Sequence, residues 1–191
     1  MKSLSMAILF AATLASGSSF AEHHTDKHKS TKVEEAEKVA TVEIHTATER
    51  GAGASLGEVV VRETEHGLIF EPSLAGLSPG LHGFHLHENA SCKPSTKEGK
   101  VTPAGAAGGH YDPKKSTHHD APWGKGHLGD LPALFVDQDG TATRPVLAPR
   151  LKAKDLKDKT LMIHAGGDNY SDDPKPLGGG AGRIACGVIG K

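Results

Sequence analysis

Apolar and polar side chains alternate with a period of two along much of the chain after residue 40. Successive side chains of a β-strand point to opposite faces, so this period predicts strands rather than helices. Turn-forming residues separate the segments, and we expect about eight short strands. They cover residues 41–46, 56–64, 67–77, 83–88, 133–136, 141–147, 161–164 and 184–189. Residues 155–159 have the pattern of one helical turn, and Asp139-Gly140 is typical of a hairpin turn.

Two long stretches, residues 89–132 and 165–182, interrupt this rhythm and are rich in Gly, Pro, Asp and Lys. Loops of this length in a compact domain are usually functional or disordered. The first stretch also holds many side chains that can bind a metal, which favours a functional role.

The N-terminal 39 residues differ from the rest. Residues 1–21 combine Lys2, an apolar run and small residues before Glu22, which is the pattern of a secretory signal peptide. The alternative is a short membrane anchor, but the apolar run is too short to span a bilayer. Residues 22–39 sustain no apolar face and predict a flexible tail. Its histidines (23, 24 and 28) either capture metal loosely or belong to a solvated linker. One domain then covers residues 40–191.

Composition and net charge limit the classes of partner that the protein can bind. The formal net charge is −1 at pH 7, and removal of residues 1–21 would take away Lys2 and no acid. This balance argues against general nucleic-acid binding. The 24 glycines and the low aromatic content of 4% suit a β-architecture with many turns. Without the signal peptide, the chain is expected to have no membrane partner.

The only two cysteines are Cys92 and Cys186. In a secreted chain, one intramolecular disulfide is the natural interpretation. In the chain-entropy model this disulfide would stabilise the folded state by up to ~4–5 kcal/mol. Two free thiols or two metal ligands are the alternative.

Two histidines alternate with apolar residues in the segment Gly83-Phe84-His85-Leu86-His87-Glu88. On a strand, His85 and His87 point to the same face and present two imidazoles side by side. Two neutral imidazoles on a rigid strand make half of a transition-metal site. The competing interpretation is two solvent-facing histidines on an ordinary strand.

A second cluster of possible ligands lies in the first long loop. His110, His118, His127 and Asp130 would fill a tetrahedral zinc shell with three imidazoles and one carboxylate. His119 competes with His118, and spacing alone does not choose between them. His164 is a further candidate beside His85 and His87. Because a deprotonated imidazole can bind a metal with each nitrogen, His110 is a hypothetical bridge between two metals.

These motifs, together with Gly182-Arg183-Ile184-Ala185-Cys186-Gly187, resemble secreted bacterial copper,zinc superoxide dismutases over residues 40–191. The resemblance implies an all-β fold, an eight-stranded antiparallel Greek-key β-barrel or sandwich with two long functional loops. It also implies one copper and one zinc per subunit, bridged by His110. The implied copper ligands are His85, His87, His110 and His164, and the implied zinc ligands are His110, His118, His127 and Asp130.

The resemblance further implies roles for single residues. The family's gaps from the bridging histidine favour His118 over His119, and its disulfide falls on Cys92 and Cys186. Arg183 matches the active-site arginine, and Asp168 matches an acid that hydrogen-bonds ligand histidines of both metals. His82, by the same resemblance, braces the barrel and binds no metal.

The function implied is the dismutation of superoxide to dioxygen and hydrogen peroxide in the periplasm, with Arg183 and His110 in catalytic roles. This would protect the cell envelope from superoxide. Homodimers and monomers both occur in the family. A periplasmic copper or zinc buffer without turnover is the alternative, and a non-catalytic barrel used for partner contacts is a second. The latter would be expected to lack some of the copper ligands or Arg183.

Overall fold

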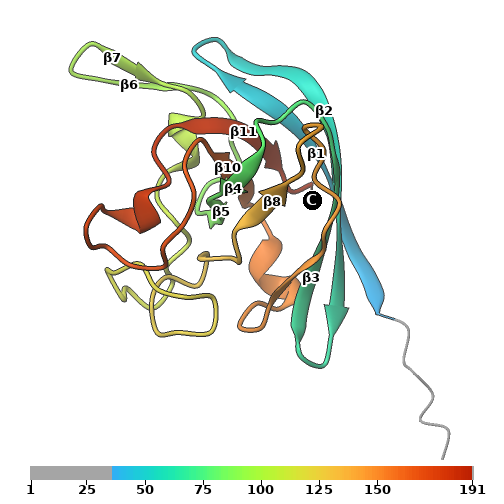
Figure 1. Cartoon of the computed structure of the whole chain (residues 1–191). Coiled ribbons are helices and arrows are strands. Elements are labelled where there is room, and N and C mark those ends of the chain that lie inside the picture. Colours follow the sequence, from blue (N-terminus) through green and yellow to red (C-terminus); the bar gives the residue numbers. More distant parts are fainter. Residues whose placement is uncertain (1–35, 191) are drawn as a thin grey trace, which may run out of the picture. The chain divides into compact units, whose positions relative to one another are not determined.

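The computed structural model describes residues 36–190, and strands dominate this part of the chain (Figure 1). The signal peptide and most of the tail therefore lie outside the described residues. The strands are β1 (Glu37–Thr48), β2 (Gly51–Thr64), β3 (Gly67–Leu74), β4 (Gly80–His82), β5 (Phe84–His87), β6 (Ser95–Lys97), β7 (Lys100–Thr102), β8 (Leu134–Val136), β9 (Val146–Ala148), β10 (Thr160–His164) and β11 (Arg183–Val188). Three short 3-10 helices accompany them: η1 (Gly105–Ala107), η2 (Ala153–Leu156) and η3 (Leu177–Gly179).

Seven strands form one antiparallel sheet in the order β5-β10-β11-β1-β2-β3-β9. The C-terminal strand β11 lies beside the N-terminal strand β1, and the chain crosses from β3 near one edge to β5 at the other. Such long connections between distant antiparallel strands are the mark of a Greek key. The predicted all-β fold with antiparallel strands is confirmed.

The strand predicted for residues 83–88 belongs to a longer segment that changes partner at Gly83. Before this residue, β4 pairs with β8, and after it β5 pairs with β10. A Cβ at position 83 would come within 3.0 Å of the His85 ring and 3.4 Å of His164 Cβ. The glycine therefore lets the backbone change direction where histidine side chains crowd against it. A single bridge from Leu74 to Ala142 links the β8–β9 connection to β3 and helps to curl the structure into a barrel.

The core follows from the alternation in the sequence. Val42 and Ile44 of β1 and Val59 and Val61 of β2 are fully buried in one large apolar cluster. Phe70 of β3 and Phe84 of β5 meet in it edge to face, with ring centroids 5.7 Å apart. Each fully buried side chain of this size contributes about 1.5–3 kcal/mol to folding.

A smaller apolar cluster lies outside the main core, under the first long loop. Met162 of β10 and Cys186 of β11 pack there against Ala104 and Ala107 of the loop. The disulfide between Cys92 and Cys186 fastens the loop at the same place, as predicted. The loop is thus held to the sheet both by apolar contact and by a covalent bond.

The structure departs from the predicted elements in four places. β1 begins at Glu37, so it includes the last three residues of the expected tail, of which Glu37 and Lys38 pair with β2. The first long loop contains the hairpin β6–β7, which was not predicted. Residues 137–140 form the expected tight turn, but β8 and β9 pair with β4 and β3 rather than with each other. The helical turn lies at Ala153–Leu156 instead of 155–159. For β1, β8 and β9 the choice of neighbouring strand, which local pattern does not contain, decided the outcome.

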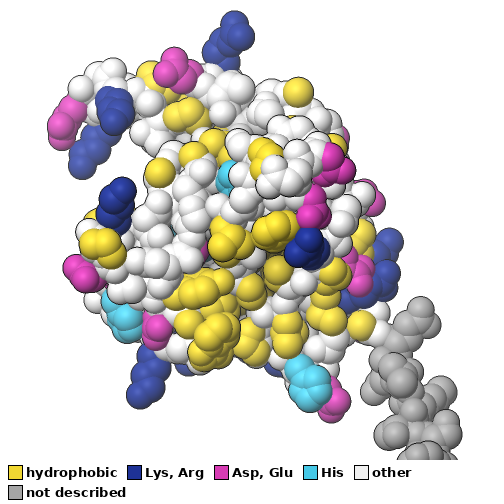
Figure 2. All heavy atoms as spheres, viewed as in Figure 1, with side chains coloured by type: hydrophobic (Ala, Val, Ile, Leu, Met, Phe, Trp, Pro, Cys, Tyr) yellow, Lys and Arg dark blue, Asp and Glu magenta, His cyan; other side chains and the backbone are white. Residues whose placement is uncertain are grey.

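The β6–β7 hairpin projects from the barrel (Figure 1), and its end carries exposed charged residues. Figure 2 shows the surface hollowed below this projection. Within residues 36–190, no helix combines the length and apolar character that crossing a membrane requires.

Candidate metal centre

The two faces of β5 serve two purposes. Phe84 and Leu86 point into the main core, whereas His85 and His87 point to the opposite face of the sheet. All four side chains are buried because the long loops cover that second face. The expectation of two solvent-facing histidines is thus excluded by burial.

The first long loop docks on the edge of β5 that β10 leaves free. Leu86 donates its N–H to Gly129 O at 2.9 Å and accepts at its carbonyl from Tyr111 N at 2.8 Å. These bonds place His110 opposite His87 and Asp130 opposite His85 as bridge partners. An open strand edge needs such partners for its backbone groups. This pairing brings the segment around His110 and the segment around Asp130 next to the histidines of β5, and we call these two segments the arms of the loop.

One group of possible ligands consists of four histidines, which we call the four-histidine group. Their ligand nitrogens lie within 4.8 Å of one another, and the ring centroids of His85 and His110 are 4.0 Å apart. In each ring one buried nitrogen lacks a hydrogen-bond partner among the described residues. These atoms are His85 Nδ1, His87 Nε2, His110 Nε2 and His164 Nε2. Unpartnered polar atoms are costly when buried, so four of them converging on one place fit a metal ion.

A second group surrounds the carboxylate of Asp130, and we call it the Asp130 group. It contains His110, His119, His127 and Asp130, with their ligand atoms again within 4.8 Å of one another. Asp130 Oδ1 lies 2.8 Å from His110 Nδ1, 2.9 Å from His119 Nδ1 and 3.2 Å from His127 Nδ1. Three imidazoles and one carboxylate are a donor set that suits tetrahedral zinc.

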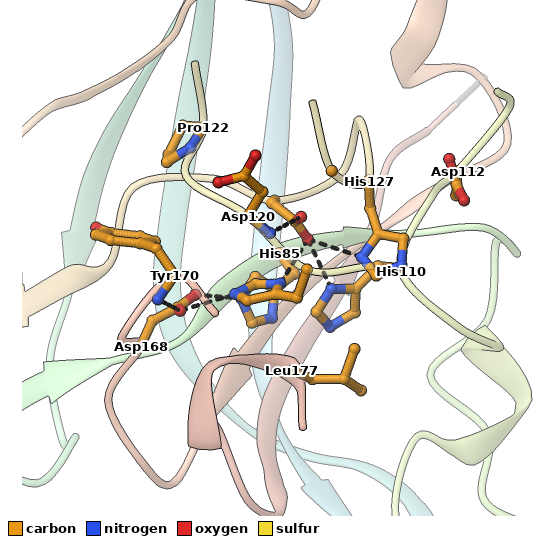
Figure 3. Close-up of polar contacts among 12 residues, drawn as sticks. His85, His110, Asp112, Asp120, Pro122, His127, Asp168, Tyr170 and Leu177 are labelled. Carbon is orange, nitrogen blue, oxygen red and sulfur yellow. Dashed lines mark hydrogen bonds and ion pairs between the residues drawn. The ribbon is translucent and has the colours of Figure 1, made fainter. Parts of the chain in front are cut away.

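His110 belongs to both groups. Its Nδ1 faces Asp130, whereas its Nε2 belongs to the four-histidine group. Figure 3 shows His110 beside His85 and His127, between the two sides of the cluster. One imidazole is therefore positioned to contact two ions with its two nitrogens.

Asp168 connects the two groups from the second long loop. Its Oδ2 accepts from His85 Nε2 at 2.8 Å, and its Oδ1 accepts from His119 Nε2 at 2.8 Å. These bonds leave Nδ1 of each ring for a metal and fix the ring orientation. Gly178 makes room for this contact, because a Cβ there would overlap Asp168 Oδ1 and lie 2.8 Å from His119 Nε2.

The prediction of His118 in the second group is wrong. His118 is exposed, and its Nδ1 donates to the carbonyl of Ser116 at 2.9 Å. His119 is buried instead, because its backbone N–H donates to Asp172 Oδ2 at 2.9 Å. This bond fixes the backbone of His119 against the second long loop, with the His119 side chain directed inward. Neighbouring residues of an irregular segment cannot be told apart by spacing, and the adjacent pair of histidines was the only signal.

Arg183 lies at the start of β11 and is anchored by the first long loop. Its NH1 donates to Ala104 O at 2.7 Å and its NH2 to Gly108 O at 2.6 Å. Gly108 O also accepts from His87 Nδ1 at 3.0 Å. One backbone carbonyl thus ties the guanidinium to a ring of the four-histidine group. Sequence reasoning missed this carbonyl, because a backbone acceptor has no residue signature.

Burial controls protonation in the four-histidine group. It lowers the pKa of His85 to about 3 and the pKa of His164 to about 4, with the charge of His110 adding to both shifts. The rings are therefore neutral near pH 7, as metal ligands must be. Burial also tends to lower the pKa of His119, but its hydrogen bonds to Asp130 and Asp168 outweigh this and raise it to about 9.

His82 lies beside the centre without joining either group. Its Nδ1 lies 2.6 Å from His164 O and its Nε2 lies 2.8 Å from Ser78 O. With both nitrogens occupied by carbonyls, the ring braces β4 against the end of β10, as its place in the family pattern implied.

Comparisons with known proteins agree with this geometry. The family model described as copper/zinc superoxide dismutase matches residues 55–189. A relative named superoxide dismutase [Cu-Zn] 2 from Salmonella typhimurium is 60% identical over 149 residues, which are 78% of this chain and 86% of the relative. The solved structure of the Cu/Zn superoxide dismutase from Brucella abortus matches with a TM-score of 0.77 and 52% identity, over 78% of this chain and 98% of that one. A monomeric copper, zinc superoxide dismutase from Salmonella enterica matches with a TM-score of 0.71 and 57% identity, over the same shares.

The fold and the paired histidine groups define a β-barrel metalloprotein with two adjacent metal sites. The chain belongs to the copper/zinc superoxide dismutase family.

The two neighbouring histidines permit a matched test of the Asp130 group. We expect His119→Ala to weaken zinc binding at least roughly 100-fold, because loss of even a supporting partner costs 10–100-fold. His118→Ala removes the same ring one residue earlier and should leave zinc binding unchanged. Zinc competition with a chromophoric chelator measures both, and the reverse order of effects would contradict the placement of His119.

The shifted pKa values predict a stability maximum near pH 6.5 for the metal-free protein. Histidines of the unfolded chain have a pKa near 6.5 and bind protons below that pH. In the folded protein the pKa of His85 is about 3 and that of His164 about 4, so these rings bind protons only at lower pH. Stability should therefore fall as the pH drops from 6.5 towards 4. Above 6.5, folded His119 keeps its proton until about 9, and stability should fall as the pH rises through that value.

Urea unfolding of the metal-free protein between pH 4 and pH 9 measures this profile. His119→Asn should flatten the alkaline limb and leave the acid limb in place. An unfolding midpoint that is constant above pH 6.5 in the unmodified chain would contradict the assignment.

Proposed function

We propose that the protein dismutes superoxide to dioxygen and hydrogen peroxide with one copper and one zinc ion per subunit. The observation that carries the proposal is the sharing of His110 between the two groups, with one nitrogen in each. A plain metal store has no need of a common ring between two sites. Family membership and the complete set of buried ring nitrogens support the same function.

The donor atoms suggest which residues hold which ion. Copper would take the four-histidine group, because imidazole suits both oxidation states of this metal. Zinc would take the Asp130 group, whose mixed imidazole and carboxylate set matches its preference. The zinc ligands that we propose are His110, His119, His127 and Asp130. Bound copper supplies the one-electron exchange with superoxide, and zinc, which has no redox chemistry, orders the loop.

The residues of the chain would bind the anion and move protons. Arg183 is held by two carbonyls, which use only part of the five N–H donors of its guanidinium. The remaining donors can bind a small anion such as superoxide. His110 Nε2 would hold a proton in one half of the cycle and give it to the departing peroxide, while its Nδ1 would remain a donor of the Asp130 group. Two superoxide anions and two protons then yield one dioxygen and one hydrogen peroxide.

We propose the periplasm as the location. The signal-peptide pattern of residues 1–21 and the disulfide between Cys92 and Cys186 support it, since such bonds persist in oxidising compartments. Every member of both histidine groups comes from one chain, so catalysis does not require a partner subunit. A homodimer therefore stays a prediction, and one of the related structures is described as monomeric.

The rival function is a copper or zinc buffer without turnover. An in-gel stain for superoxide removal, run with and without cyanide or a metal chelator, separates the two. We expect cyanide-sensitive activity from the metal-loaded protein and none after metal removal. Stoichiometric uptake of both metals without superoxide removal would instead favour the buffer.

Arg183 provides a sharper test of the mechanism. We expect Arg183→Glu to slow turnover by roughly tenfold or more, because it replaces an attracting charge with a repelling one near the copper site. Both metals should stay bound, since Arg183 belongs to neither histidine group. Pulse radiolysis measures the rate, and metal analysis checks occupancy. Arg183→Lys keeps the charge and should lose less activity than the glutamate variant, whereas equal rates in all three proteins would remove Arg183 from the mechanism.

A further inference from the structure

A second pocket lies behind the Asp130 group, away from Asp168. It has a volume of about 760 Å³, within the range of small-ligand pockets. Residues 111–114, which follow His110, line one side, and residues 124–126, which precede His127, line another. Figure 3 shows Asp112, which lines this pocket, and Asp168 on opposite sides of the histidine cluster. The pocket is therefore distinct from the proposed copper site.

The pocket is strongly basic on a protein that is nearly neutral overall. Five cationic side chains line it against two acids, although the whole chain has 22 basic and 23 acidic residues. The cations are Lys114, Lys125, Arg150, Lys152 and Lys154. Like charges gathered in this way create a positive local field, which attracts anions to the pocket.

No carboxylate neutralises these cations within residues 36–190. The pairs of Arg or Lys with a carboxylate within 4.0 Å in that part of the chain are Arg62–Glu71 and Arg144–Asp137, both elsewhere. The two acids of the pocket accept hydrogen bonds from backbone N–H groups nearby. Asp155 Oδ2 accepts from Lys152 N at 3.0 Å, and Asp112 Oδ2 accepts from Thr117 N at 3.0 Å.

Arg150 forms the rigid part of the pocket. Its Nε donates to Pro122 O at 2.7 Å and its NH1 to Gly126 O at 3.0 Å, and NH2 donates to His127 O. Three of five N–H groups thus hold the loop in place, and two are left for a ligand. The half-buried guanidinium is held in one orientation, and its two remaining N–H groups can donate to phosphate oxygens.

The rest of the lining fits a ligand that carries more than charge. Tyr111 and Leu128 provide apolar surface, and Lys159 Nζ lies 4.7 Å from the centre of the Tyr111 ring. This lysine adds a further positive charge beside the pocket. Exposed lysines around a fixed guanidinium, with apolar surface beside them, match a phosphate monoester whose organic part is small.

We propose that this basic pocket binds a phosphate monoester, held by Arg150 together with Lys125 and Lys152, which come from two separate segments of the lining. The ester is either a soluble metabolite or the headgroup of a lipid. Residues 111–114 and 124–126 belong to the segments of the loop that carry His110 and His127, so an ester bound to Arg150 would contact both segments.

The test uses the copper- and zinc-loaded protein at low ionic strength, with glycerol 3-phosphate as the soluble probe and glycerol as the uncharged control. Vesicles of phosphatidylcholine with and without phosphatidic acid form the second arm. We expect saturable binding by calorimetry or co-sedimentation, weakened at least about tenfold in the double variant Lys125→Gln, Lys152→Gln. The matched control is Lys97→Gln, Lys100→Gln, which removes two exposed lysines paired on the β6–β7 hairpin.

Binding of the soluble ester that only the pocket variant weakens supports the proposal and assigns a soluble source. The same pattern with phosphatidic acid vesicles alone supports it and assigns a lipid source. Absence of saturable binding in both arms overturns the proposal. Equal weakening by the two double variants also overturns it, because it would show a response to overall charge rather than to the pocket. None of these lysines belongs to either histidine group, so superoxide removal should be unchanged in both variants.

Discussion

The metal centre depends on the pairing of the first long loop with the free edge of β5. The backbone of Leu86 bonds to both arms of the loop, through Gly129 O and Tyr111 N. Since side chains of neighbouring paired residues lie close together, this pairing alone brings His110 to His87 and Asp130 to His85. The same backbone groups would otherwise stay unpaired at a sheet edge. The hydrogen bonds that satisfy the free edge of β5 therefore also bring the ligand side chains together.

Two carboxylates then organise the imidazoles that the backbone has collected. Asp130 faces the Nδ1 atoms of three rings, whereas Asp168 occupies the Nε2 atoms of His85 and His119. Asp168 leaves Nδ1 of His85 and His119 for a metal, and Asp130 belongs to the same donor set as the three Nδ1 atoms that it faces. Burial adds the second condition, because it keeps His85 and His164 neutral near pH 7. The protein by itself therefore sets both the orientation of these rings and the neutral state of His85 and His164.

Much of the fold and of the site could be predicted from local pattern. The period of two located the strands, and the His85/His87 pair on one face of a strand pointed to a metal. The presence of only two cysteines predicted the disulfide. Partner choice could not be predicted in this way. The strands that flank the turn at residues 137–140 pair with β4 and β3, and β1 starts before the expected tail ends. Such outcomes depend on neighbours that are distant in sequence.

The amino-acid sequence by itself determined which side chains are available: the histidines, the acids, the strand that presents His85 and His87, and the cysteine pair. Only the tertiary structure decided which of them meet. His119 enters the Asp130 group and His118 faces solvent, because a backbone bond to Asp172 in another loop sets the direction of the chain there. Gly108 O joins Arg183 to His87 although a carbonyl leaves no trace in a sequence. In irregular segments no period relates position to direction, so long-range hydrogen bonds make the choice.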